Sequence, residues 1–303
     1  MNKTYDITII GAGPAGLTAA IYARRASKTV LVLEAKNYGG QIINTLDIEN
    51  YPVEPHISGF DFATRLYNQA KDFGTEIVFE KVTGLNKKDN VFEITSENNT
   101  YQSLSVIIAT GSENRKLGLE NEDELVGKGV SYCATCDGAF YKNKTVAVVG
   151  GGNTALEDAL YLAEIASKVY LIHRRNEFRG ESSLADRLKE KKNVEFVLNS
   201  NVTKLNSDEK INSIDVIDND GTSRNIEIDG LFVAVGRVPE NQYFDSLITL
   251  DDSGYIVSDE KCHTNIDGAF VAGDNRTKEV RQLVTATSDG AIAAIESVKY
   301  LNN

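Results

Sequence analysis

The chain has 303 residues. This length exceeds the size at which a single hydrophobic core usually stops growing, so it predicts two domains. Its 32 Lys and Arg residues against 44 Asp and Glu leave a net charge of -12, which argues against nucleic acid or an anionic membrane as a partner. No apolar run approaches the ~18 residues of a membrane span, and three cysteines are too few for a disulfide framework. We therefore expect a cytoplasmic protein.

The first predicted element is a buried strand over residues 7–10, which leads into a glycine-rich turn and an alanine-rich helix ending near Arg25. A second strand, over residues 30–33, ends at Glu34. This order of strand, turn, helix and strand is typical of a dinucleotide-binding unit. The turn contains Gly11, Gly13, Ala15 and Gly16.

The same order of elements recurs from residue 146. A strand over 146–149 leads into a second glycine turn and a helix, and a strand over 169–172 then ends at His173. A single such turn can be a plain strand-to-helix connection, but two copies in the same context are more specific. The second turn contains Gly150, Gly152, Asn153 and Thr154.

Both turns suit a dinucleotide for the same reasons. The first glycine permits the tight turn, the second lets the backbone approach a pyrophosphate, and the following helix directs its N-terminal amides at the phosphates. The residue that closes the second strand then discriminates the ribose. Glu34 would accept hydrogen bonds from a free 2′-hydroxyl and repel a 2′-phosphate, so the first copy fits the adenosine of FAD or NAD.

The second copy has no acidic residue at that place. His173 is followed instead by arginines at 174, 175 and 179, and guanidinium groups match the geometry of a phosphate. Arg174, Arg175 and Arg179 therefore predict NADP. The alternative is a solvent-exposed basic patch without a ligand.

Glycine turns after apolar strands, at 109–111 and 234–236, mark the expected crossings between the domains. The chain then returns to a strand and glycine pattern at 268–274 and a final helix from about 289 to 300. This predicts an α/β fold of two Rossmann-like domains, with the NADP-binding domain inserted into the FAD-binding domain. The expected boundaries are 1–113 and 246–303 for the FAD domain and 114–245 for the NADP domain.

Cys133 and Cys136 form a Cys-x-x-Cys pair shortly before the second turn. Zinc needs four ligands, usually from two such pairs, and the sequence has no second pair. His173 and His263 stand isolated, so no metal site is expected. An inert buried pair is an alternative, but the spacing in an α/β protein favours a redox-active disulfide. Cys262 and His263 match no motif, and a structural role is expected for both.

Together these motifs resemble the low-molecular-weight, bacterial-type thioredoxin reductases over essentially the whole chain. The segments that carry the resemblance are Cys133–Gly138, Gly150–Ala155, His173–Arg175 with Arg179, Gly39–Gln41, and Ala272–Asp274 followed by Arg281 and Gln282.

The resemblance implies a homodimer in which NADPH reduces FAD, FAD reduces the Cys133/Cys136 disulfide, and the dithiol reduces thioredoxin. Asp137 would be the acid–base group beside the pair, and helix capping is the alternative role for it. Asp274 would hold the ribityl chain of FAD. The implied FAD contacts are Gly11, Gly13, Ala15, Gly16, Glu34, Gly40, Gln41, Asn50, Thr110, Gly111, Gly273, Asp274, Arg281 and Gln282. The implied NADPH contacts are Gly150, Gly152, Asn153, Thr154, His173, Arg174, Arg175 and Arg179.

Two places depart from the family pattern. Residues 51–56 lack the usual glycine turn, and Leu283 stands where a smaller residue is common. Both bear on the loop beside the flavin and leave the redox pair untouched.

Two other functions stay open. One is a dithiol oxidase of the same fold, which needs no nicotinamide, and the arginines after His173 argue against it. The other is a nonenzymatic redox sensor that uses the cysteines as a switch, which turnover with thioredoxin would exclude.

Overall fold

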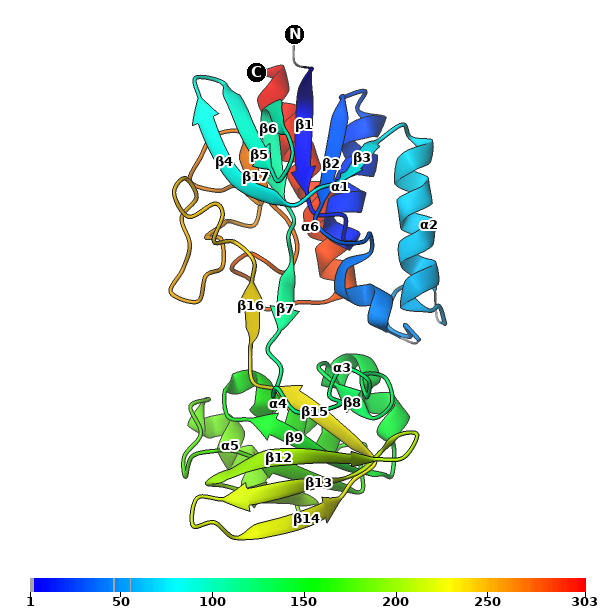
Figure 1. Cartoon of the computed structure of the whole chain (residues 1–303), viewed down its shortest axis with the longest axis vertical. Helices are drawn as coiled ribbons and strands as arrows, with labels where there is room; N and C mark the ends of the chain where they lie inside the picture. Colours follow the sequence, from blue (N-terminus) through cyan, green and yellow to red (C-terminus); the bar gives the residue numbers. More distant parts are fainter. Residues whose placement is uncertain (1–2, 46, 55) are drawn as a thin grey trace. The chain divides into compact units, whose positions relative to one another are not determined.

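The computed structural model describes residues 3–45, 47–54 and 56–303, and the chain divides into two compact units (Figure 1). The first unit contains Met1–Glu113 and Val238–Asn303, and the second contains Asn114–Arg237. The crossing segments, β7 (Ser112–Asn114) and β16 (Arg237–Pro239), pair with each other. The first crossing lies where the sequence placed it, whereas the second comes before the expected boundary at 245/246.

The first unit is built on one mixed sheet in the order β3-β2-β1-β6-β5-β4, with β17 also paired to β6. The strands β1, β2, β3, β6 and β17 are parallel, whereas β5 pairs antiparallel with both β4 and β6. The strands are β1 (Thr4–Ile10), β2 (Val30–Glu34), β3 (Glu76–Phe79), β4 (Val82–Lys88), β5 (Val91–Ser96), β6 (Thr100–Ile108) and β17 (Ala269–Val271).

Successive side chains along the parallel strands point to opposite faces of this sheet, and both faces are buried, as is usual for parallel sheets. Ile9 and Val32 belong to one apolar cluster, which includes residues of α1 and α6. Leu33 belongs to the cluster of the opposite face. The helical elements of the unit are α1 (Pro14–Arg25), η1 (Gly40–Asn44), α2 (Gly59–Asp72) and α6 (Leu283–Asn302).

The second crossing is displaced from the expected position because Phe244 and Ile248 are core residues of the first unit. Both are buried in the same cluster as Leu33. The residues after β16 therefore return to the first sheet before the regular strand pattern of the C-terminal segment resumes.

The second unit contains a parallel sheet in the order β11-β10-β9-β15-β8 and a separate antiparallel sheet in the order β12-β13-β14. Its strands are β8 (Val130–Ser131), β9 (Thr145–Gly150), β10 (Lys168–Ile172), β11 (Val194–Val197), β12 (Ser200–Ser207), β13 (Ile211–Asp218), β14 (Ser223–Glu227) and β15 (Gly230–Ala234). Its helices are α3 (Ala134–Asp137), η2 (Gly138–Tyr141), α4 (Asn153–Ala163) and α5 (Ser182–Lys189).

The order β1-α1-β2 in the first unit matches β9-α4-β10 in the second, with parallel neighbouring strands in both. The predicted fold class, α/β with one Rossmann-like unit inserted into another, is confirmed. The final helix begins earlier than expected, at Leu283, because Gln282 and Thr285 form a reciprocal capping box. Within residues 3–45, 47–54 and 56–303, no helix combines the length and apolarity that crossing a membrane requires.

A buried ion cluster ties the start of α6 to the loop after β17. Asp289 accepts hydrogen bonds from Arg276 at 2.9 and 3.0 Å, from Lys278 at 2.8 Å, and from the backbone amide of Gly273 at 3.0 Å. Burial by itself would raise the pKa of Asp289, but the hydrogen bonds from Arg276 and Lys278 outweigh it and hold the pKa below the usual range. The carboxylate is therefore ionised at neutral pH.

Replacement of this carboxylate, Asp289→Ala, leaves two cations buried without their partner. We expect it to lower the free energy of unfolding by about 3–5 kcal/mol, measured from urea unfolding at pH 7. Because the folded-state pKa is depressed, the stabilisation is present above the unfolded pKa of about 4 and is lost as the pH falls through the folded pKa. The control, Asp186→Ala, removes an exposed pair with Lys189 and should leave the midpoint unchanged. Equal effects of the two variants would contradict this account.

Candidate functional site

The first glycine turn joins β1 to α1 and is closed by backbone contacts. At Gly11, with φ of 112°, an added Cβ would lie 2.3 Å from the carbonyl oxygen of Ala109, and at Gly16 it would lie 1.9 Å from the carbonyl oxygen of Gly11. Gly13, the N-cap of α1, has only a contact at 4.0 Å, and no side chain caps the helix. The first amides of α1 are therefore accessible to an anion.

Glu34 ends β2, and its carboxylate reaches back to this turn. Its two oxygens accept hydrogen bonds from the amides of Ala12 at 2.7 Å and Lys36 at 2.9 Å. An added Cβ at Gly40 would lie 3.4 Å from the Cα of Gly13. The carboxylate, the open helix end and the η1 glycine thus gather beyond the carboxyl ends of β1 and β2.

The segment after β17 returns to the same place. An added Cβ at Gly273 would lie 3.0 Å from the Cβ of Ala15 in α1. Asp274 follows and is half-buried, and its carbonyl oxygen accepts a hydrogen bond from Arg281 Nε at 3.4 Å. The Arg281 guanidinium lies 4.3 Å from the ring centre of Tyr255, which orients the side chain.

Two more of the expected FAD residues, Asn50 and Thr110, contact side chains that are far from them in the sequence. The amide group of Asn50 donates to the side-chain oxygen of Gln282 at 3.3 Å. The hydroxyl of Thr110 accepts from Asn275 at 3.0 Å and donates to Asn241 at 3.2 Å. Of the remaining expected contacts, Gln41 is exposed in η1 and Gly111 has φ of 69° after β6.

The second turn, between β9 and α4, repeats the geometry of the first. An added Cβ at Gly150 would lie 2.3 Å from the carbonyl oxygen of Ala234. Gly152 is the N-cap of α4, where no side chain caps the helix and an added Cβ would meet nothing within 4 Å. Asn153 and Thr154 are exposed in the first turn of α4. This helix end is also accessible to an anion.

The loop after β10 lies over the second turn. The amide of Arg179 donates to the carbonyl oxygen of Gly151 at 2.7 Å, and an added Cβ at Gly151 would lie 2.2 Å from the ring of His173. Burial lowers the pKa of His173, and the charges of the neighbouring arginines lower it further, so the ring is neutral at pH 7. The arginines that surround this neutral ring are exposed, and they are Arg174, Arg175 and Arg179.

Cys133 and Cys136 form a disulfide at the start of α3, with an S–S distance of 2.06 Å and a Cα–Cα distance of 5.3 Å. Cys133 is the N-cap of the helix, and its carbonyl oxygen accepts hydrogen bonds from the amides of Cys136 and Asp137. Both cysteines are half-buried. The pair is therefore a disulfide held in one helical turn.

Asp137 ends α3 and is linked to the same pair through Ser131. The hydroxyl of Ser131 lies 2.6 Å from Asp137 Oδ2 and accepts a hydrogen bond from the amide of Cys133 at 3.1 Å. Burial raises the pKa of Asp137, and the hydrogen bond from Ser131 offsets part of that increase. Asp137 is the N-cap residue of η2, but its side chain makes no capping hydrogen bond there, and the N-cap of α3 is Cys133.

A buried carboxylate anchors the segment that leads to the disulfide. Glu122 accepts hydrogen bonds from the amides of Leu117 at 2.9 Å and Gly118 at 2.8 Å, and from the hydroxyl of Tyr132 at 2.8 Å. Burial, reinforced by Glu122, raises the pKa of Tyr132. The neutral phenol therefore stays a donor and fixes the residue next to Cys133.

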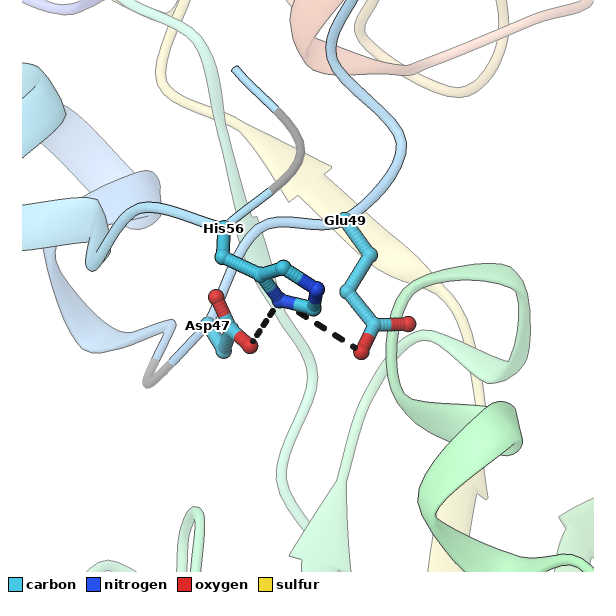
Figure 2. A group of neighbouring side chains, drawn as sticks. All are labelled: Asp47, Glu49 and His56. Carbon is cyan, nitrogen blue, oxygen red and sulfur yellow. Dashed lines mark hydrogen bonds and ion pairs between the residues drawn. The ribbon is translucent and has the colours of Figure 1, made fainter.

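Asp47, Glu49 and His56 form the group, among the described residues, whose side chains could hold a metal ion (Figure 2). Nδ1 of His56 lies 2.9 Å from Asp47 and 4.0 Å from Glu49. The His56 side chain is 70% exposed, and its hydrogen bond to Asp47 raises its pKa. An exposed ion pair accounts for this arrangement.

The two departures from the family pattern pack in one small apolar cluster. Tyr51 and Leu283 both lie against the buried side chains of Ile48, Ile57 and Phe62. Pro55 of the 51–56 segment lies outside the described residues. Both departures from the family pattern therefore have a packing role in this cluster.

Cys262 and His263 have the structural surroundings expected for them. Cys262 is fully buried in the core with its thiol 3.8 Å from the carbonyl oxygen of Asp289, and burial raises the pKa of that thiol to about 12. His263 lies at the surface near Asp259 and Glu296, at 3.0 and 3.5 Å.

Several residues around these sites carry no sequence motif and were missed by sequence reasoning. They share only a weak signal, because each is a polar residue whose burial becomes evident only in the fold. They are Glu122, Ser131, Asn241, Asn275 and Asp289.

Residues 5–290 match the family described as pyridine nucleotide-disulphide oxidoreductase. The chain belongs to this family. A thioredoxin reductase of Listeria innocua is 44% identical over 99% of this chain and 95% of that protein, and one of Treponema pallidum is 41% identical over 100% and 99%. The crystal structure of thioredoxin reductase from Streptococcus pyogenes has a TM-score of 0.95 and 38% identity, covering 100% of this chain and 99% of that one. The resemblance to the thioredoxin reductases is therefore confirmed.

The anchor before the disulfide can be tested with Glu122→Gln. An amide replaces one acceptor oxygen with a donor that faces backbone amides, so we expect a loss of about 1–3 kcal/mol in the free energy of unfolding, measured in urea. Glu124→Gln changes an exposed neighbour by the same chemistry and should have no effect. If both variants unfold at the wild-type midpoint, the carboxylate does not hold this segment.

Proposed function

We propose that the chain is an NADPH-dependent thioredoxin-disulfide reductase that uses FAD and acts as a homodimer in the cytoplasm. The observation that carries the proposal is the half-buried disulfide beside a carboxyl group whose pKa burial raises. A reductase needs such an arrangement because it must break a disulfide and move protons at the sulfurs in each cycle.

The first unit fits FAD. The uncapped N-terminus of α1, with the open position at Gly13, suits a pyrophosphate, and Glu34 stands where a carboxylate would accept from a ribose hydroxyl. Gly273 and Asp274 would approach the chain between ribose and ring. When bound, FAD supplies an isoalloxazine that accepts a hydride from nicotinamide and passes an electron pair to a disulfide.

The second unit fits NADPH. Gly152 leaves open space at the uncapped end of α4, where a pyrophosphate would meet backbone amides. The exposed guanidinium groups of Arg174, Arg175 and Arg179 would bind the 2′-phosphate, which selects NADPH over NADH. The neutral ring of His173 packs under this loop and holds it against the turn.

The disulfide would complete the transfer to thioredoxin. Two electrons and two protons convert Cys133 and Cys136 to thiols. A thiolate of this pair then attacks the disulfide of oxidised thioredoxin, and the second thiol resolves the mixed disulfide, so the pair is oxidised again and thioredoxin leaves as a dithiol. In this proposal Asp137 exchanges the protons.

Replacement of either cysteine separates flavin reduction from disulfide reduction. Cys133→Ser and Cys136→Ser should each still let NADPH bleach the flavin absorbance, because hydride transfer to the flavin involves no sulfur, whereas thioredoxin turnover should vanish. Stopped-flow absorbance with steady-state thioredoxin reduction measures both. Cys262→Ser, which alters the buried third cysteine, serves as the control and should retain turnover.

Near-wild-type thioredoxin reduction by either serine variant would show that the relay is wrong. A wild-type protein that oxidises dithiols with oxygen and ignores NADPH would instead indicate the oxidase. Reversible oxidation of the pair without turnover would indicate the sensor.

The arginines provide a separate test of the nucleotide. Arg174→Ala combined with Arg175→Ala should weaken NADPH binding by about 10²- to 10³-fold, since two charge-assisted contacts are lost, and should change NADH binding little. The control is Arg187→Ala combined with Arg224→Ala, which removes the same amount of charge from exposed positions elsewhere in the second unit. Titration calorimetry with both nucleotides gives the ratio, and an equal loss for NADH would exclude 2′-phosphate recognition.

A further inference from the structure

Ser131 belongs to no motif, yet its hydroxyl contacts both the carboxyl group of Asp137 and the backbone of Cys133. It is 3% exposed at the end of β8, a strand held in the parallel sheet by β15. We propose that Ser131 is a positioning residue of the reaction, which holds the carboxyl of Asp137 in place and links it to the backbone of Cys133. This inference rests on the proposed function and adds a residue to it.

The geometry makes Ser131 a bridge. Its oxygen accepts the amide hydrogen of Cys133 at 3.1 Å, and its own hydrogen is directed to Asp137 Oδ2 at 2.6 Å. A hydroxyl that accepts one hydrogen bond is a stronger donor in another, so the two bonds reinforce each other. The acid is thereby tied to the first residue of the disulfide turn.

The hydroxyl also has a second acceptor. The carbonyl oxygen of Cys133 lies 3.4 Å from the Ser131 oxygen, farther than the carboxylate. When Asp137 is ionised, the hydrogen of Ser131 belongs to the short, charge-assisted bond. When Asp137 is protonated, the carboxyl can donate to Ser131, whose hydrogen then turns to this carbonyl. Ser131 can therefore satisfy both protonation states and favours the charged one.

Other titratable groups do not supply this effect. Tyr141 on η2 interacts electrostatically with Asp137, but burial raises the pKa of Tyr141 to about 12, so it is neutral in the working range. Asp158 lies on α4, which packs against α3. The charged groups that act on Asp158 are Glu157 and Arg237, and Asp137 is not among them. The sulfurs of Cys133 and Cys136 carry no charge in the disulfide. The hydroxyl is thus the group that opposes the effect of burial on Asp137.

The test is the pH profile of thioredoxin reduction. The limb that belongs to Asp137 is identified by its loss in Asp137→Asn, which should itself slow turnover by about 10²- to 10⁴-fold. In Ser131→Ala the ionised carboxyl loses its donor, so its pKa rises and this limb should move about 1–2 pH units upward. Ser131→Thr keeps the hydroxyl and should restore the wild-type midpoint.

The matched control is Ser200→Ala. Ser200 is 2% exposed in the same unit and bonds to the carboxylate of Asp218, so its loss has a similar structural cost. It should leave the limb unmoved. In the Asp137→Asn background, Ser131→Ala should add no further loss of activity, because its effect passes through that carboxyl. An unmoved limb in Ser131→Ala, or full additivity with Asp137→Asn, overturns the proposal.

A second readout does not depend on turnover. The carboxyl carbon of Asp137, assigned in a ¹³C spectrum by its absence in Asp137→Asn, can be titrated in the oxidised protein without thioredoxin. Its midpoint should rise by about 1–2 pH units in Ser131→Ala and stay in place in Ser200→Ala. If the titration midpoint shifts but the wild-type protein does not reduce thioredoxin, the proposed function is refuted and the link between Ser131 and Asp137 is retained. An unshifted midpoint would refute the link whatever the activity.

Discussion

The architecture depends on one contact between backbones, made once in each unit. The turn after the first strand of the nucleotide fold touches the carbonyl oxygen that ends the neighbouring strand, Ala109 in one unit and Ala234 in the other. A side chain would lie 2.3 Å from that oxygen in both, so glycine is required at 11 and at 150. The contact places the following helix with its uncapped amides at the sheet edge. The phosphate-binding property is therefore a consequence of how tightly two strands and a turn pack.

Sequence reasoning succeeded where the signal is local. Apolar strands, glycine spacing and the residues that close β2 and β10 predicted two Rossmann-like units and the placement of the first crossing. Sequence reasoning missed the position of the second crossing because Phe244 and Ile248 pack in the same core cluster as Leu33, which lies far away in the sequence. The early start of α6 was missed because the residues before 289 show no helical pattern in the sequence. The helix begins there because Gln282 and Thr285 form a capping box.

The polar residues that support the sites were the least predictable. Ser131 resembles any serine in a strand, and only the turn of α3 brings Asp137 back within 2.6 Å of it. Asp289 lies at the start of the predicted final helix and belongs to no motif, yet two cations and a backbone amide contact its carboxylate. Such groups are fixed by tertiary contacts between distant segments, and a single sequence contains no record of those contacts.

The insertion of one unit into the other also has a consequence for the order of folding. The ends of the inserted unit meet, with the amide of Arg115 donating to the carbonyl oxygen of Gly236 at 3.0 Å, so that unit is complete once residue 237 has been synthesised. The outer unit still lacks β17 and α6 at that moment, and the core residues Phe270 and Ala293 with them. Because chains emerge from the ribosome N-terminus first, the middle of this sequence folds before the two ends that enclose it. The side of α1 that packs against α6 stays uncovered until this last helix is made.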